Sequence, residues 1–133
     1  MFSVIHEIHF SYGHRLLHYK GKCARLHGHN ARVQVEVSAK KLDRLGMVVD
    51  FYKIRECIGQ WINQHLDHQM ILSRKDPVAK LLQKQREPVV LIDANPTAEV
   101  LAKMIFDYAR KKRLPVSKVT FWETPKSSAV YHE

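Results

Sequence analysis

The chain has 133 residues, of which 45% are hydrophobic, and its 22 basic and 13 acidic side chains give a formal net charge of +9. This length predicts a single domain over residues 1–133, with enough apolar residues for a buried core. No apolar run reaches the ~18 residues of a membrane-spanning helix, and the N-terminus lacks the layout of a signal peptide. Two cysteines make no disulfide framework. We therefore expect a cytoplasmic protein without a membrane partner.

The positive charge favours an anionic partner, but it is scattered along the chain and no aromatic residues are interleaved with it. We therefore expect no nucleic-acid partner. A smaller basic group follows the first predicted strand and could hold a polyphosphate, although a solvated basic face is the alternative; its members are Arg15, Lys20, Lys22 and Arg25.

Residues 2–14 alternate between apolar and polar side chains, which predicts a half-buried strand. His14 ends the apolar face of this strand. A second alternating run begins at His27, and His27 and His29 share a face with the valines that follow them. If the two strands pair antiparallel, His14 comes opposite the other two histidines. Three neutral imidazoles with one open position form a catalytic zinc site, so these residues are the predicted metal ligands.

Cys23 lies in the loop between these two strands, four residues before His27. We expect its thiol to lie beside the metal without binding it. The other cysteine, Cys57, adjoins the apolar stripe of a predicted helix that follows an Asp50 N-cap, so it reads as a core residue. Asp67 and His68 come directly after that helix. By themselves they fit a helix cap and a surface histidine better than a catalytic pair.

The second half of the chain predicts a short helix from Pro77 and a short extended run at residues 89–92. We expect the second long helix to begin at Asn95 as its cap, with Pro96 in the first turn. Two strands then follow, at residues 116–124 and 127–132. Glu123 ends the apolar face of the first, so its carboxylate needs either an arginine or a ligand with adjacent N–H groups.

This order of elements predicts an α+β fold, in which a four-stranded antiparallel sheet carries two long helices on one face. Such a sheet has open edges that favour aggregation unless they are paired. Closure of the sheets of several subunits into a barrel would solve this problem.

Six short motifs occur in an order that resembles a known family, and together they span nearly the whole chain: residues 10–16, Cys23 with the His27-Gly28-His29 triplet, and residues 46–51, 66–68, 95–99 and 123–124. They resemble the 6-pyruvoyl-tetrahydropterin synthase family. The short spacer between Cys23 and His27 is most similar to its branch of 6-carboxy-tetrahydropterin synthases, which act in queuosine biosynthesis. Two positions depart from the usual pattern, Ala31 and Val100, and both could reshape the substrate pocket.

The resemblance implies a tunnelling fold, in which trimers form a twelve-stranded barrel and two trimers stack into a homohexamer with active sites between subunits. It implies Zn²⁺ on the three histidines and Cys23 as the proton acceptor. Asp67 and His68, from a neighbouring subunit, would tune the thiol. Glu123 would anchor the pterin ring and join the proton relay, and Thr97 would contact the pterin.

The implied reaction converts 7,8-dihydroneopterin triphosphate to 6-carboxy-5,6,7,8-tetrahydropterin, with release of acetaldehyde and triphosphate. Zinc would supply a Lewis acid, and a cysteine near it would readily be a thiolate. The alternatives are a 6-pyruvoyl-tetrahydropterin synthase, which leaves the side-chain carbons joined, and a non-catalytic zinc-stabilised module that binds a pterin or purine. A closed four-ligand site that included Cys23 would favour the last.

Overall fold

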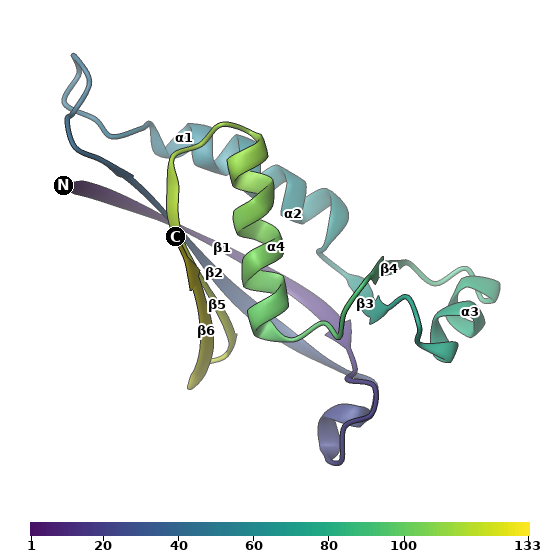
Figure 1. Ribbon diagram of the computed structural model, residues 1–133. Coiled ribbons are helices and arrows are strands. Elements are labelled where there is room, and N and C mark those ends of the chain that lie inside the picture. Colours follow the sequence, from purple (N-terminus) through teal and green to yellow (C-terminus); the bar gives the residue numbers. More distant parts are fainter.

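A computed structural model describes residues 1–133, which form one six-stranded sheet with helices packed on it (Figure 1). At its centre is a long antiparallel hairpin whose strands run side by side along their full length, β1 (Phe2–His14) and β2 (His27–Ala39). Two further antiparallel strands extend the sheet on the β2 side, β5 (Val116–Thr124) and β6 (Ser127–His132). These four strands are those predicted from the alternating pattern.

The prediction of a four-stranded, purely antiparallel sheet is wrong, because two short strands pair in parallel on the other side of β1, β3 (Gln69–Ser73) and β4 (Val89–Ile92). The sheet order is therefore β4-β3-β1-β2-β5-β6. Short strands buried on both faces are continuous apolar runs without alternation, so β3 carried no recognisable period. β3 continues directly from Asp67 and His68, and this pairing fixes both residues beside β1.

The first helix runs without a break from Phe51 to His65 in three segments, α1 (Phe51–Ile54), the π-helical η2 (Arg55–Gly59) and α2 (Gln60–His65). Its buried isoleucines are spaced by four residues, Ile54, Ile58 and Ile62. A regular α-helix of 3.6 residues per turn would let that spacing drift around the axis, and the wider π turn offsets the drift. Asp50 caps the helix as predicted, since its side chain accepts a hydrogen bond from the Tyr52 amide.

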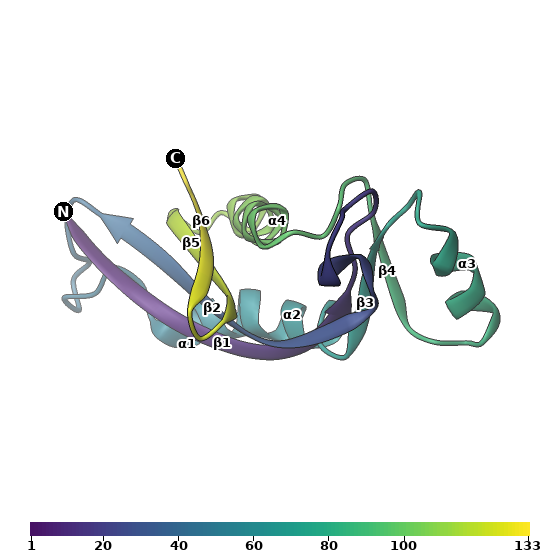
Figure 2. The same ribbon diagram turned by 90° about the horizontal axis from the view of Figure 1, so that it is seen from below.

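The second long helix, α4 (Ala98–Lys111), begins two residues later than predicted. Thr97, not Asn95, is its N-cap, and the Thr97 hydroxyl accepts from the Val100 amide at 3.2 Å. The short helix α3 (Pro77–Lys84) begins at Pro77 as predicted, and Asp76 caps it by accepting from the Val78 amide. Leu81 of this helix is 61% exposed, because α3 lies beyond the β4 edge and apart from the main core (Figures 1 and 2).

Both long helices pack on the same face of the sheet, and their apolar side chains form one core with those of β1, β2 and β5. Figure 2 shows the curved central hairpin with α4 lying over it. The opposite face of the hairpin carries polar side chains such as Glu7, Arg32 and Gln34. None of the helices is both long enough and apolar enough to cross a bilayer.

Candidate metal and active site

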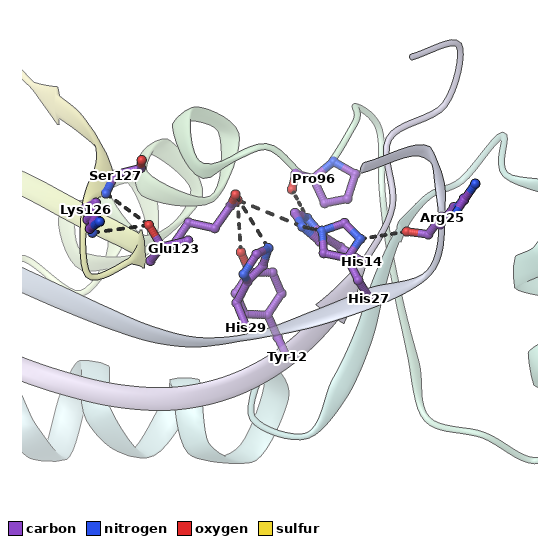
Figure 3. A network of polar contacts seen from close by, with 10 residues as sticks. Tyr12, His14, Arg25, His27, His29, Pro96, Glu123, Lys126 and Ser127 are labelled. Carbon is purple, nitrogen blue, oxygen red and sulfur yellow. Dashed lines mark hydrogen bonds and ion pairs between the residues drawn. The ribbon is translucent and has the colours of Figure 1, made fainter. Parts of the chain in front are cut away.

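The three predicted metal ligands meet at one end of the β1–β2 hairpin, on the helix-covered face. In the strand register His14 lies opposite His27, and Tyr12 lies opposite His29. The alternation of the strands therefore brings all three imidazoles into one volume, where one ligand atom from each lies within 4.8 Å of the other two. His14 is 1% exposed, and the segment that leads into α4 contacts it through Pro96, whereas His27 and His29 are partly exposed (Figure 3).

Backbone carbonyls orient two of the rings. Nδ1 of His14 lies 2.7 Å from the Pro96 carbonyl oxygen, and Nδ1 of His27 lies 2.6 Å from that of Arg25. A carbonyl oxygen only accepts, so both Nδ1 atoms carry the hydrogen and both Nε2 atoms of the neutral rings hold free lone pairs. Carbonyls that fix the tautomer in this way are the usual outer partners of metal-binding histidines.

The charge balance of this cluster fits a cation. The Nε2 atoms of His14 and His27 lie 3.0 Å apart, although neither has a hydrogen to donate when both rings are neutral. Nε2 of His29 is buried without a hydrogen-bond partner. The nearest charged group is the Glu123 carboxylate, whose oxygens lie 3.5 Å from Nε2 of His29 and 3.9 Å from Nε2 of His14. Lone pairs and a negative charge converge here, so the residues fit a divalent metal ion.

A proton is a poor substitute for that ion. Burial lowers the pKa of His14 and outweighs the hydrogen bond to Pro96 and the nearby Glu123 carboxylate, which act to raise it. Burial likewise lowers the pKa of His29. Near neutral pH the rings of His14 and His29 are thus held uncharged, which is the form that binds a metal.

Glu123 lies near the end of β5, next to the hairpin. No arginine pairs with its carboxylate, although the sequence left that partner open. The Tyr12 hydroxyl donates to the Glu123 carboxylate at 3.3 Å (Figure 3). Burial, followed by the negative charge of Glu123, raises the pKa of Tyr12, so the phenol stays protonated and remains a donor. The carboxylate keeps free acceptor capacity toward the metal cluster.

Cys23 lies in the 3₁₀ turn η1 (Lys22–Ala24) of the β1–β2 loop and is half-buried. Its sulfur is not in the close cluster that the three histidines form. No hydrogen bond or ion pair joins it to Glu123, Asp67 or His68. The role of Cys23 beside the metal therefore stays a prediction.

Asp67 and His68 form a pair, with 2.9 Å between Oδ2 of Asp67 and Nδ1 of His68. The other Asp67 oxygen accepts from the Ser11 amide at 2.9 Å. Burial acts to raise the pKa of Asp67, but this amide and the neighbouring histidine outweigh it and lower the pKa below its usual range. His68 adopts a left-handed backbone with φ 57°, and its side chain is 80% exposed.

The structure keeps this pair out of the close histidine cluster, although His68 lines a cavity of about 670 Å³ whose wall also includes His27 and His29. Asp67 lines a cavity of about 540 Å³ together with side chains of the opposite, polar face of the sheet, among them Ser11, Asn30, Arg32 and Trp122. No polar contact joins Asp67 or His68 to the three histidines.

Comparison with known proteins agrees with this geometry. Residues 3–133 match the family described as 6-pyruvoyl tetrahydropterin synthase. Proteins named 6-carboxy-5,6,7,8-tetrahydropterin synthase are similar to this chain: that of Haemophilus influenzae is 33% identical over the full length of both chains, and that of Rickettsia bellii is 31% identical over 94% of this chain and 96% of the relative. This chain belongs to the 6-pyruvoyl tetrahydropterin synthase family.

Solved structures show that the family fold is shared. A protein of Wolinella succinogenes superposes with a TM-score of 0.82 at 24% identity, covering 99% of this chain and 98% of the other. The 6-pyruvoyl tetrahydropterin synthase of Caenorhabditis elegans superposes with a TM-score of 0.74 at 23% identity, covering 99% and 95%.

Sequence reasoning missed several supporting groups of this family member. The Pro96 carbonyl and the Tyr12 hydroxyl contact the site, and although both residues lie within the motifs at residues 10–16 and 95–99, the sequence assigned them no role in the site. Arg15, a candidate for holding phosphate, instead pairs through its guanidinium with Asp76, with Nε 2.7 Å from Oδ2. Its charge is therefore already neutralised.

Proposed function

We propose that this chain is a zinc-dependent 6-carboxy-5,6,7,8-tetrahydropterin synthase. It would convert 7,8-dihydroneopterin triphosphate to 6-carboxy-5,6,7,8-tetrahydropterin and release acetaldehyde and triphosphate, a carbon–carbon lyase step of queuosine biosynthesis. The observation that carries the proposal is the convergence of three imidazoles beside a carboxylate. The names of full-length relatives at 31–33% identity support the substrate class.

His14, His27 and His29 would hold the zinc ion, which when bound supplies a Lewis acid to the hydroxyl oxygens of the substrate side chain. Cys23, on the neighbouring loop, takes the carbon-bound proton as a thiolate. His68, held by Asp67, exchanges that proton with the thiol. Glu123 accepts hydrogen bonds from the 2-amino group and ring N–H of the pterin and belongs to the same relay, and Thr97 contacts the ring.

The His68 side chain is 80% exposed and its one polar side-chain partner in the chain is Asp67, which supports a site shared between subunits. We therefore propose a cytoplasmic homohexamer built from two trimers, in which β1, β2, β5 and β6 of three subunits close a twelve-stranded barrel. β6 has an unpaired edge, and β1 pairs with β3 only from Tyr12 to His14, so both offer edges on which such pairing would occur.

A product assay tests the proposal. The zinc-loaded protein is incubated with 7,8-dihydroneopterin triphosphate, and acetaldehyde is measured with alcohol dehydrogenase and NADH. We expect acetaldehyde and triphosphate in equal amounts. Triphosphate without acetaldehyde would identify the second candidate, a 6-pyruvoyl-tetrahydropterin synthase, which the description of the matched family favours.

A Cys23→Ala variant is the matched control for this assay. We expect it to keep the zinc content of the unmodified protein and to lose turnover, because the thiol would transfer the proton and would not bind the metal. Loss of zinc from Cys23→Ala would instead support a structural site with cysteine as a ligand. That result would favour a non-catalytic, zinc-stabilised pterin-binding module.

A further inference from the structure

The side chain of Asn95 binds both polar groups of one loop residue. Its Oδ1 accepts from the Leu17 amide at 2.8 Å, and its Nδ2 donates to the Leu17 carbonyl at 3.0 Å. An amide N–H only donates and a carbonyl only accepts, so a carboxamide is the side chain that satisfies both. Asn95 is half-buried and is not the N-cap of α4. Helix capping therefore does not explain why an asparagine occupies this position.

Leu17 belongs to the loop that carries Cys23. The amide of its neighbour, Leu16, donates to the Cys23 carbonyl at 2.8 Å. This is the one backbone hydrogen bond that joins the two arms of the loop, because the other bonds within it, from Ala24 and Arg25, are local to the η1 turn. The position of Cys23 thus depends on the Leu16–Leu17 arm, and Asn95 fixes that arm.

The segment of residues 95–97 also contacts the metal site. The residue after Asn95, Pro96, is buried and gives its carbonyl to Nδ1 of His14, and the next, Thr97, begins α4. Consecutive residues therefore hold the loop that carries the thiol, a metal ligand and the start of a core helix. A displacement of the loop relative to the histidines changes the distance between the thiol and the reacting carbon.

We propose that Asn95 is a positioning residue that holds the Cys23 loop in register with the three-histidine site. The proposal rests on the proposed function for the role of Cys23, but the placement of the loop can be measured without turnover. The change Asn95→Ala removes both bonds to Leu17 and leaves the Pro96 carbonyl in place. The loop then opens more often, while the metal ligands keep their orientation.

Three measurements on the zinc-loaded Asn95→Ala protein test this. Zinc content should equal that of the unmodified protein. Alkylation of Cys23 by iodoacetamide, followed by mass spectrometry, should be faster by about fivefold or more, since each lost hydrogen bond shifts the opening equilibrium by about that factor. Alkylation of Cys57 should be unchanged. The kcat for the pterin triphosphate should fall by about 10- to 100-fold with KM within about twofold.

Asn63→Ala is the matched control, because Asn63 is exposed on α2 and its side chain makes no hydrogen bond. It should change none of the three readouts. Equal Cys23 alkylation and equal kcat in Asn95→Ala would overturn the proposal, as would a loss of zinc parallel to the loss of kcat. If the unmodified protein shows no turnover, the proposed function fails, whereas zinc content and alkylation still decide the role of Asn95.

Hydrogen exchange on the unmodified protein gives a second test, which holds even if Asn95→Ala does not fold. The Leu17 amide donates to a side chain, whereas His18 and Tyr19 are exposed and their amides make no backbone hydrogen bond. We expect exchange at Leu17 to be slower by about fivefold or more than at those two amides. Equal exchange at all three would contradict the proposal.

Discussion

The Glu123 carboxylate has two possible roles, and both follow from its position. It lies 3.5 Å from Nε2 of His29 and accepts from the Tyr12 hydroxyl. With the metal in place it could serve as a fourth protein ligand, which would close the site, or it could hold the pterin, which requires an open metal position. The second role is the one that the proposed reaction needs.

Glu123→Gln separates these roles, because the amide keeps the shape but loses the charge and half the acceptor capacity. We expect zinc content to be unchanged and the affinity for neopterin, measured by calorimetry, to fall by about tenfold or more, as for a lost hydrogen bond to a charged group. Zinc content measured by mass spectrometry is the control. Zinc loss with unchanged neopterin affinity would make Glu123 a ligand and the site structural.

The buried histidines also predict how the metal-free protein responds to acid. The folded-state pKa values of His14 and His29 are lowered by burial from 6.5. Below that pH the unfolded chain binds protons that the folded chain does not, so stability present at higher pH is lost as the pH falls. Each histidine contributes up to about 1.4 kcal/mol per pH unit.

Urea unfolding of the EDTA-treated protein at pH 7.5 and 5.5 measures this loss. We expect a clear decrease in the free energy of unfolding at pH 5.5, and a smaller decrease in a His14→Gln variant, which has one buried imidazole fewer. Equal stability of the metal-free protein at both pH values would show that the rings are charged in the folded state.

Among the elements, α3 joins the site to the β4 edge of the sheet. Its cap, Asp76, accepts from the Val78 amide and also binds Arg15, the residue directly after the metal ligand His14. The Asp76 side chain is fully buried, and its pKa is lowered chiefly by the hydrogen bond from Arg15. This single carboxylate thus ties the start of α3 to the end of β1.

Two cap variants isolate the contribution of that ion pair. Asp50 caps α1 with a bond to the Tyr52 amide and has no ion pair, so Asp50→Ala should lower the free energy of unfolding by about 1 kcal/mol. Asp76→Ala leaves Arg15 without its partner and should cost about 3 kcal/mol or more. Urea unfolding at pH 7 measures both. Equal losses would mean that the Arg15 pair adds nothing beyond the cap.

The elements differ in how well the sequence predicts them. The four long strands and both long helices follow from periodicity, because each buries one face. The three-histidine cluster follows as well, since strand alternation and one antiparallel register fix it. β3 has no alternating face, so periodicity does not reveal it. The side chain of Asn95 binds Leu17, 78 residues away in the sequence, and Thr97 caps α4 in its place. A contact between residues so far apart in the sequence produces no local sequence pattern.

At the scale of the whole molecule, the sheet separates the proposed catalytic groups. Cys23 belongs to the loop fixed beside its own histidines, whereas His68 is exposed and its partner Asp67 lines a cavity on the polar face. Within one chain no polar contact joins His68 to Cys23 or to the three histidines, so the proposed function completes the constellation between subunits. In a closed oligomer, His68 of one subunit would reach the thiol of the next.

Mixing two inactive variants tests this arrangement. Cys23→Ala and His68→Ala subunits are combined, dissociated in mild urea and reassembled, and light scattering should give about six times the mass of one chain. If each site takes Cys23 and His68 from different subunits, about a quarter of the sites in a random mixture are intact, so about a quarter of the turnover returns. Cys23→Ala mixed with His29→Ala should regain none, because both residues belong to one subunit's site. Absence of recovery in the first mixture, with the assembled mass unchanged, would place the whole site within one chain.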